Sequence, residues 1–121
     1  MGKMRSFKTG ATRNDNTDKH DYEGFLSPIV IEAYGKYMHK HRKQADGQLR
    51  DSDNWHKGFG EGKKHFDVCI KSLWRHFLDL WFYHRGYKCR EEIDDAICGI
   101  LFNVMAYYYM LLKNRQKKGK K

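Results

Sequence analysis

The sequence has no apolar run long enough to cross a bilayer and no internal repeat. A membrane-spanning helix needs about 20 consecutive, mostly apolar residues. The most apolar stretch, residues 97–112, is interrupted by Gly99 and Asn103. We therefore expect this stretch to form a buried helix and expect no membrane partner.

Cysteine is scarce, with only Cys69, Cys89 and Cys98 and no CxxC motif. An odd number of cysteines without a signal peptide is typical of an intracellular protein with reduced thiols. The sequence therefore predicts a cytoplasmic location.

Acidic residues are outnumbered, and the net charge over 121 residues is +9. Six basic residues crowd the last nine positions: Lys113, Arg115, Lys117, Lys118, Lys120 and Lys121. Such a tail is either solvated or contacts nucleic acid or a membrane surface. At this length we expect one domain. Residues 1–24 are predicted to be a flexible or extended arm, residues 25–112 a single helical domain and residues 113–121 a basic tail.

Helical spacing without strand alternation predicts an all-α fold. The expected architecture is a small bundle of three main helices with an extended N-terminal arm and a long Gly-rich loop. The first helix begins at Ser27, a suitable N-cap, followed by Pro28 at the first helical position, and Asp46-Gly47 is its expected stop. The second covers about residues 66–84 and ends at Gly86, and the third covers about residues 90–113.

Large apolar residues recur at helical spacing along the second and third helices, which predicts buried faces. On the second helix, Phe66, Ile70, Leu73, Phe77 and Trp81 share one face with His84. On the third they are Ile93, Ile97, Ile100, Val104, Tyr108 and Leu111.

A stripe of more polar residues runs along each of these two helices. It comprises Cys69, Ser72, His76, Asp79 and Tyr83 on the second, and Glu92, Asp95, Gly99 and Asn103 on the third. A turn at Gly86 would make the helices antiparallel neighbours, so the two stripes can converge. The alternative is that the acidic residues near position 92 only complement the dipole of the third helix.

Converging carboxylates in a partly buried place favour a bound cation, and oxygen ligands suit Mg²⁺ or Mn²⁺. The candidate metal ligands are Asp79, Glu92 and Asp95, with Glu32 as a further possibility. The candidate catalytic residues are the same three carboxylates and His76, which would accept a proton or orient a ligand.

The Gly-rich loop, residues 47–64, is a second candidate site, because long loops in compact domains are often functional. Arginine and lysine match phosphate oxygens, asparagine can bind a base or sugar, and tryptophan can stack on a base. The candidate nucleotide-binding residues are Arg13, Arg50, Asn54, Trp55, Lys57 and Arg75. The alternative is a solvated turn with Trp55 packed beneath it.

Five stretches in order carry a resemblance: "TGATR" at 9–13, "DYEGFLSP" at 21–28, "DNWHKG" at 53–58, "SLWRHF" at 72–77 and "EEIDDAICGILFNV" at 91–104. Together they resemble a family of small, mostly phage-encoded proteins related to phage dATP/dGTP diphosphohydrolases. The resemblance covers most of the chain and implies a location in the host bacterial cytoplasm.

The resemblance also implies an all-helical protein near the nucleotide pyrophosphohydrolase group, in which ExxE and ExxD pairs hold Mg²⁺ against a nucleoside triphosphate. Glu92 and Asp95 supply an ExxD here, whereas His76 and Asp79 stand where an ExxE would be expected. The stretch "GEGKK" after "DNWHKG" is an apparent insertion relative to that family.

Three functions follow as hypotheses. The first is a phage-type nucleotide-binding protein, most concretely a Mg²⁺-dependent pyrophosphohydrolase acting on a purine deoxynucleoside triphosphate. The second is a non-catalytic binder that sequesters a signalling nucleotide. The third is a nucleic-acid or host-protein interaction module that uses the basic tail. Aromatic faces on short helices also predict a homo-oligomer.

Overall fold

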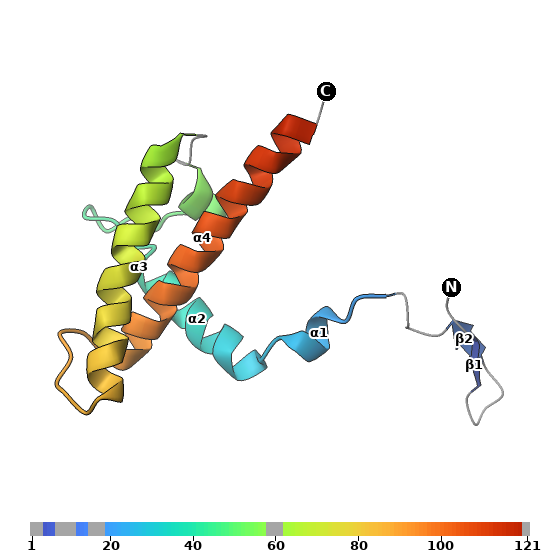
Figure 1. Cartoon of the computed structure of the whole chain (residues 1–121), viewed down its shortest axis with the longest axis horizontal. Helices are drawn as coiled ribbons and strands as arrows, with labels where there is room; N and C mark the ends of the chain where they lie inside the picture. Colours follow the sequence, from blue (N-terminus) through green and yellow to red (C-terminus); the bar gives the residue numbers. More distant parts are fainter. Residues whose placement is uncertain (1–3, 7–11, 15–18, 58–61, 120–121) are drawn as a thin grey trace. The chain divides into compact units, whose positions relative to one another are not determined.

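The protein is mostly helical, which confirms the predicted all-α character at that level (Figure 1). The structure is a computed structural model that describes residues 4–6, 12–14, 19–57 and 62–119. The chain divides into two compact units, Met1–Ile31 and Glu32–Lys121.

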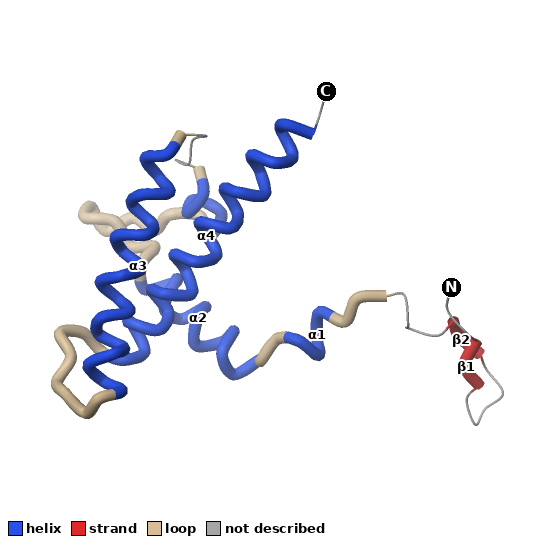
Figure 2. The backbone as a smooth tube through the Cα atoms, in the orientation of Figure 1, coloured by secondary structure: helices blue, strands red, loops and turns tan. Residues whose placement is uncertain are grey.

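The first unit contains a short β-hairpin that was not predicted. Strands β1 (Met4–Ser6) and β2 (Thr12–Asn14) pair antiparallel and are coloured red in Figure 2. They are followed by the one-turn helix α1 (Tyr22–Phe25), where the Asp21 carboxylate accepts a hydrogen bond from the Gly24 N–H at 2.7 Å. Strands of three residues are too short to show an alternating pattern, so no periodicity could predict them.

Helix α2 (Pro28–Lys40) begins where it was predicted to begin. The Val30 N–H donates to Ser27 Oγ at 3.3 Å, which confirms Ser27 as the capping residue. Capping of this kind satisfies one of the amides that the first helical turn leaves without a backbone partner.

The predicted end of this helix was wrong. After Lys40 the chain turns back on itself, with Lys43 forming a β-bridge to Leu49. Gly47 has a φ of +86°, and its N–H donates to the Gln44 carbonyl at 3.0 Å. Asp46-Gly47 therefore closes a tight turn, in which glycine adopts the left-handed region at little cost.

Three helical elements complete the second unit. They are the short 3₁₀ helix η1 (Ser52–His56), α3 (Lys63–His84) and α4 (Ile93–Gly119). α3 and α4 lie side by side and run in opposite directions, as the sequence predicted (Figures 1 and 2). α4 continues six residues past its predicted end at 113, so most of the basic tail is helical.

The predicted stop of α3 at Gly86 is confirmed. Gly86 has a φ of +83°, and its N–H donates to the Tyr83 carbonyl at 3.0 Å. The Tyr87 N–H donates to the Phe82 carbonyl at 2.8 Å, and the two rings lie 6.1 Å apart. This pair of bonds with its hydrophobic contact is a Schellman motif.

Small or polar residues, together with the large apolar Met110, are the buried residues described on α3 and α4. On α4 they are Ala96, Cys98, Gly99, Asn103, Ala106 and Met110, and on α3 they are Cys69 and Asp79. Small side chains let two helices approach closely, as ridges-into-grooves packing requires. On one side of the hairpin, Trp55 of η1 packs edge-on against Phe102 and Tyr109.

Large apolar residues are exposed on both α3 and α4. On α3 they include Ile70, Trp74, Phe77 and Trp81, and on α4 they include Ile97, Leu101, Val104, Met105, Tyr108 and Leu112. We call the α4 set the outer apolar face, and its exposed fractions range from 39% at Leu112 to 55% at Tyr108. Trp74 lies between Ser72 and His76, which face α4, and Leu101 lies between Gly99 and Asn103, which face α3, so Trp74 and Leu101 point away from each other. The prediction that Ile70, Phe77 and Trp81 of α3 and Ile97, Val104 and Tyr108 of α4 lie on buried faces was therefore wrong for the second unit by itself.

By length and composition alone, α4 is apolar enough to cross a membrane. The core helix of a globular protein meets the same criterion, and the buried side of α4 contacts α3. The expectation of no membrane partner stays a prediction.

Candidate functional site

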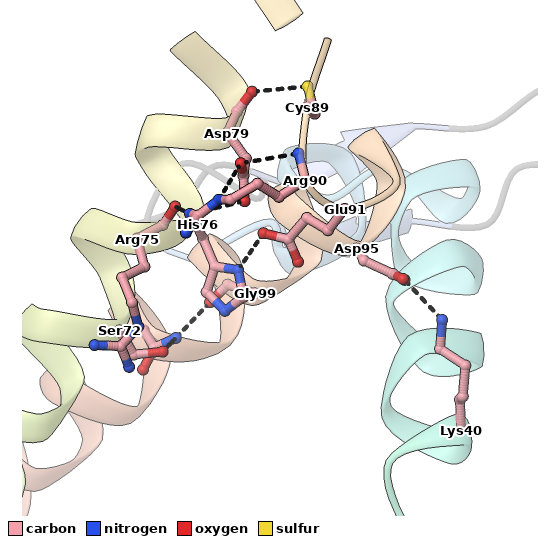
Figure 3. A network of polar contacts seen from close by, with 11 residues as sticks. Lys40, Ser72, Arg75, His76, Asp79, Cys89, Arg90, Glu91, Asp95 and Gly99 are labelled. Carbon is pink, nitrogen blue, oxygen red and sulfur yellow. Dashed lines mark hydrogen bonds and ion pairs between the residues drawn. The ribbon is translucent and has the colours of Figure 1, made fainter. Parts of the chain in front are cut away.

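A layer of polar side chains lies between α3, α4 and the loop that joins them, and we call it the polar seam (Figure 3). Its members are Ser72, His76, Asp79, Cys89, Arg90, Glu91 and Asn103. The two polar stripes seen in the sequence do face each other, but His76 and Asp79 find their partners in the joining loop.

Asp79 is the most deeply buried charged group of the seam, with an exposed fraction of 2%. Its carboxylate accepts hydrogen bonds from Arg90 Nε at 3.1 Å, from Arg90 Nη2 at 3.3 Å and from the Arg90 backbone N–H at 3.4 Å. These bonds from Arg90 hold the pKa of Asp79 below its usual range. Asp79 is therefore a carboxylate tied to a guanidinium.

Cys89 extends this contact through the backbone. Its Sγ donates to the Asp79 carbonyl at 3.1 Å, so the joining loop is attached to the end of α3 by two successive residues. Cys89 and the other two cysteines are free thiols, as expected.

His76 lies in the middle of the seam, where its Nδ1 is 2.9 Å from Glu91 Oε2. Its ring rests on Gly99 of α4, and a Cβ at that position would be 2.6 Å from both Cδ2 and Nε2 of the ring. Gly99 thus makes room for the imidazole between the two helices.

Asn103 fills the end of the seam that lies further along α4. Its side-chain amide donates to the Gly99 carbonyl at 2.7 Å and to Ser72 Oγ at 3.2 Å. A buried amide needs such partners, because an unsatisfied polar group costs about 1–3 kcal/mol.

The four predicted catalytic residues do not converge on one point. His76 contacts Glu91, and Asp79 contacts Arg90. Asp95 turns instead to α2, where it accepts a hydrogen bond from Lys40 Nζ at 2.7 Å (Figure 3). The Glu92 carbonyl accepts the first bond of α4 from Ala96, and the Glu92 side chain is exposed.

Predicted metal ligands are likewise separated. Among the described residues, no three His, Cys, Asp or Glu side chains are grouped as a metal ion would require. Glu32 lies on α2 with an exposed side chain. A Mg²⁺ or Mn²⁺ ion at Asp79 would have to displace the Arg90 guanidinium, so the side chains in this arrangement do not fit such an ion.

A cleft of about 300 Å³ lies elsewhere in the second unit, between the end of α2, η1 and α4. We call it the aromatic cleft, because Tyr37, His41, Trp55 and Phe102 line it together with the polar side chains of Arg50 and Asn54. Tyr37 and His41 are in ring contact at 4.3 Å, and Trp55 contacts Phe102 at 6.0 Å. Three of the six predicted nucleotide-binding residues, Arg50, Asn54 and Trp55, therefore meet in one cleft.

Hydrogen bonds fix the walls of the aromatic cleft. Arg50 Nη2 donates to the His41 carbonyl at 2.6 Å, and Arg42 Nε donates to the Arg50 carbonyl at 2.6 Å. Burial raises the pKa of Tyr37, with smaller contributions from the Asp95 and Glu91 carboxylates. Its phenol therefore stays protonated at neutral pH and can act as a hydrogen-bond donor.

The remaining predicted nucleotide-binding residues lie outside this cleft. Lys57 follows η1 and has its Nζ 4.0 Å from Asp51 Oδ2. Arg75 lies on α3 with an exposed side chain, and its carbonyl accepts a bond from Arg90. Arg13 lies in β2 of the first unit, where its backbone pairs opposite Arg5.

Several residues of the two sites were missed in the sequence. Arg90 and Glu91 were predicted only as the start of the third helix, which begins instead at Ile93. No spacing rule places a loop residue against a helix. Tyr37 and His41 stand four residues apart, which indicates a shared helix face. That spacing was a usable signal for one wall of the aromatic cleft.

Comparisons with protein-family models, with curated proteins and with solved structures each find no match to this chain.

Proposed function

We propose that this chain is a nucleotide-binding protein whose base and sugar site is the aromatic cleft. The observation that carries the proposal is the convergence of Arg50, Asn54 and Trp55 beside Tyr37 and His41. Ligand clefts are typically apolar or aromatic with a few placed polar groups and have volumes from about 300 Å³ upward. A cleft of about 300 Å³ suits a nucleobase with part of its sugar.

The chemistry of the lining favours a flat, polar-edged ligand. Aromatic faces stack on bases at about 1–3 kcal/mol per base, and Asn54 offers both a donor and an acceptor to a base edge. The resemblance supports a purine deoxynucleotide, because Asn54 and Trp55 belong to its "DNWHKG" stretch. In this proposal α2, α3 and α4 are the three helices of the predicted bundle. The Gly-rich loop forms one wall of the aromatic cleft through Arg50, Asn54 and Trp55.

Binding without hydrolysis is the form of the proposal that the side chains favour. The Asp79 carboxylate is committed to Arg90, and Asp95 to Lys40. A binder that sequesters a nucleotide needs no group of metal ligands. Mg²⁺-dependent pyrophosphohydrolysis, with membership of the phage family that implies it, stays a prediction.

Asn54→Ala is expected to weaken nucleotide binding about tenfold, because one net hydrogen bond to the ligand contributes roughly 1.4 kcal/mol. Titration calorimetry with dATP, dGTP and the pyrimidine nucleotides measures this loss. Asp53→Ala is the matched control, since Asp53 lies in the same 3₁₀ helix but outside the cleft lining. Equal affinities for both variants and the natural chain, or no binding of any nucleotide, would contradict the proposal.

The same titration separates binding from catalysis when Mg²⁺ is added and the nucleotide is recovered. Intact triphosphate supports sequestration. A monophosphate with pyrophosphate, formed by attack of water and lost in Glu92→Ala, would establish the hydrolase instead.

The basic end of α4 supports a second candidate function, nucleic-acid binding. Lys113, Arg115, Lys117 and Lys118 are exposed on a continuous helix that extends to Gly119. Phosphate contacts release counterions, so such binding should fall steeply with salt concentration. Deleting residues 113–121 is expected to abolish DNA and RNA binding in a filter or mobility assay, and unchanged binding would refute this function.

A further inference from the structure

The outer apolar face has no covering element among the residues that the structure describes in the second unit. At one edge the face adjoins α3, because Ile70 and Leu73 of α3 line one groove of about 290 Å³ with Val104 and Tyr108 of α4. η1 covers a different part of α4, where Trp55 contacts Phe102 and Tyr109.

We propose that the outer apolar face binds the same face of a second copy of this chain, forming a two-fold symmetric four-helix dimer. A two-fold interface uses the same surface on both subunits, so the surface must be complementary to itself. The α4 stripe meets this requirement.

The order of residues along α4 supplies the self-complementarity. With the two-fold axis passing between Val104 and Met105, two antiparallel α4 helices place Leu101 opposite the partner's Tyr108. The same register places Ile97 opposite the partner's Leu112. Every one of these side chains has an exposed fraction of 39% or more in the single chain.

Charges at the two ends of the stripe match in the same register. Asp94 in the first turn of α4 comes opposite the partner's Arg115, and both residues are exposed in the single chain. The pairing occurs twice because of the symmetry. Opposite charges at the rim of an apolar interface fix the register and orientation of the partners.

The exposed area makes this a small interface. The six side chains of the face are 39–55% exposed, so the contact buries less than the roughly 800 Å² per partner of a standard-size interface, and we expect a weak dimer. A contiguous apolar patch of a few hundred Å² on a single chain is often functional.

Leu101→Glu tests the dimer in the full chain. Sedimentation equilibrium over a wide concentration range should show a dimer for the natural chain and a dissociation constant raised at least a hundredfold for the variant. Val68→Glu is the matched control: Val68 is an exposed apolar residue of α3 outside the face, with an exposed fraction of 54%. This control should remain a dimer, and circular dichroism should report equal helix content.

A charge exchange keeps the test decisive if Leu101→Glu fails to fold. Asp94→Arg and Arg115→Asp should each weaken the dimer about tenfold, and the double variant should restore it. No restoration would overturn the proposed register. A natural chain that stays monomeric at every concentration would overturn the dimer. The dimer would also be overturned if such a monomer floated with phosphatidylcholine vesicles, because the apolar face would then bind lipid instead.

Discussion

Asp79→Ala is expected to lower the free energy of unfolding by about 2–3 kcal/mol, the range for hydrogen bonds that involve charged groups. The carboxylate lost in this variant holds both the side chain and the backbone N–H of Arg90. The joining loop would then keep only its contacts through Cys89, through Glu91 with His76 and through Arg90 with the Arg75 carbonyl. Urea denaturation followed by circular dichroism measures the loss.

The effect of Asp79 should depend on pH in a defined direction. Its pKa in the folded chain is lowered, first by the side-chain hydrogen bonds from Arg90. A lowered folded-state pKa contributes stability that is present above the unfolded-state pKa of about 3.9. That stability is lost as the pH falls through the folded-state value. The difference between the natural chain and Asp79→Ala should therefore be constant near neutral pH and shrink below about pH 4.

Two further variants separate the ion pair from simple loss of packing. Arg90→Ala leaves the buried carboxylate without its guanidinium, so its destabilisation should also diminish on acidification, as Asp79 becomes neutral. Lys88→Ala is the control, because Lys88 is an exposed cation of the same loop. It should change stability by less than about 0.5 kcal/mol. If Asp79→Ala lowers the free energy of unfolding equally at every pH, the ion pair between Asp79 and Arg90 does not contribute to that stability.

The sequence predicted those parts of the fold that local chemistry determines. Ser27 caps α2, and Gly86 ends α3 with a positive φ, because both features depend on neighbouring residues alone. The Asp46-Gly47 turn was recognised but assigned to the wrong element. An Asp-Gly pair indicates a reversal of the chain, but it does not indicate whether the preceding helix extends that far. α2 ends earlier, at Lys40.

The burial of α3 and α4 was predicted less well, for a physical reason. Hydrophobic periodicity finds the face that must leave water, and it does not say whether the same chain or another chain covers that face. Here the small and polar stripe packs within the chain, with Gly99 and Asn103 at its centre, while Trp74 and Trp81 remain exposed. If the proposed dimer forms, the α4 stripe is buried as well, and the predicted burial of that stripe holds for the assembly.

The candidate sites were predictable in part for a similar reason. Arg50, Asn54 and Trp55 lie within six positions of the sequence, so one turn of loop brings them to the same cleft. The predicted catalytic site required four residues on two helices to meet. Its outcome was decided by Arg90 and Glu91, whose positions depend on how the joining loop folds back over α3.

Gly99→Val is expected to destabilise the chain by about 3 kcal/mol, the upper part of the range for overpacking a closely packed interface. A Cβ at Gly99 would stand 2.6 Å from the His76 ring, which is held from the other side by Glu91 at 2.9 Å. Gly99→Ala should cost less, about 1–2 kcal/mol, because alanine gains up to about 1 kcal/mol over glycine in helix propensity. Thermal and urea denaturation of both variants measure these losses.

Gly35 provides the matched control, since it is also a helical glycine but has nothing within 4 Å of its Cβ position. Gly35→Ala should therefore stabilise the chain by about 0.5–1 kcal/mol. The decisive comparison is Gly99→Ala in a His76→Ala background. With the imidazole gone, the added methyl group has space, and the substitution should become neutral or stabilising. If Gly99→Ala costs the same with and without the ring, the close contact between His76 and Gly99 is not what requires glycine at this position.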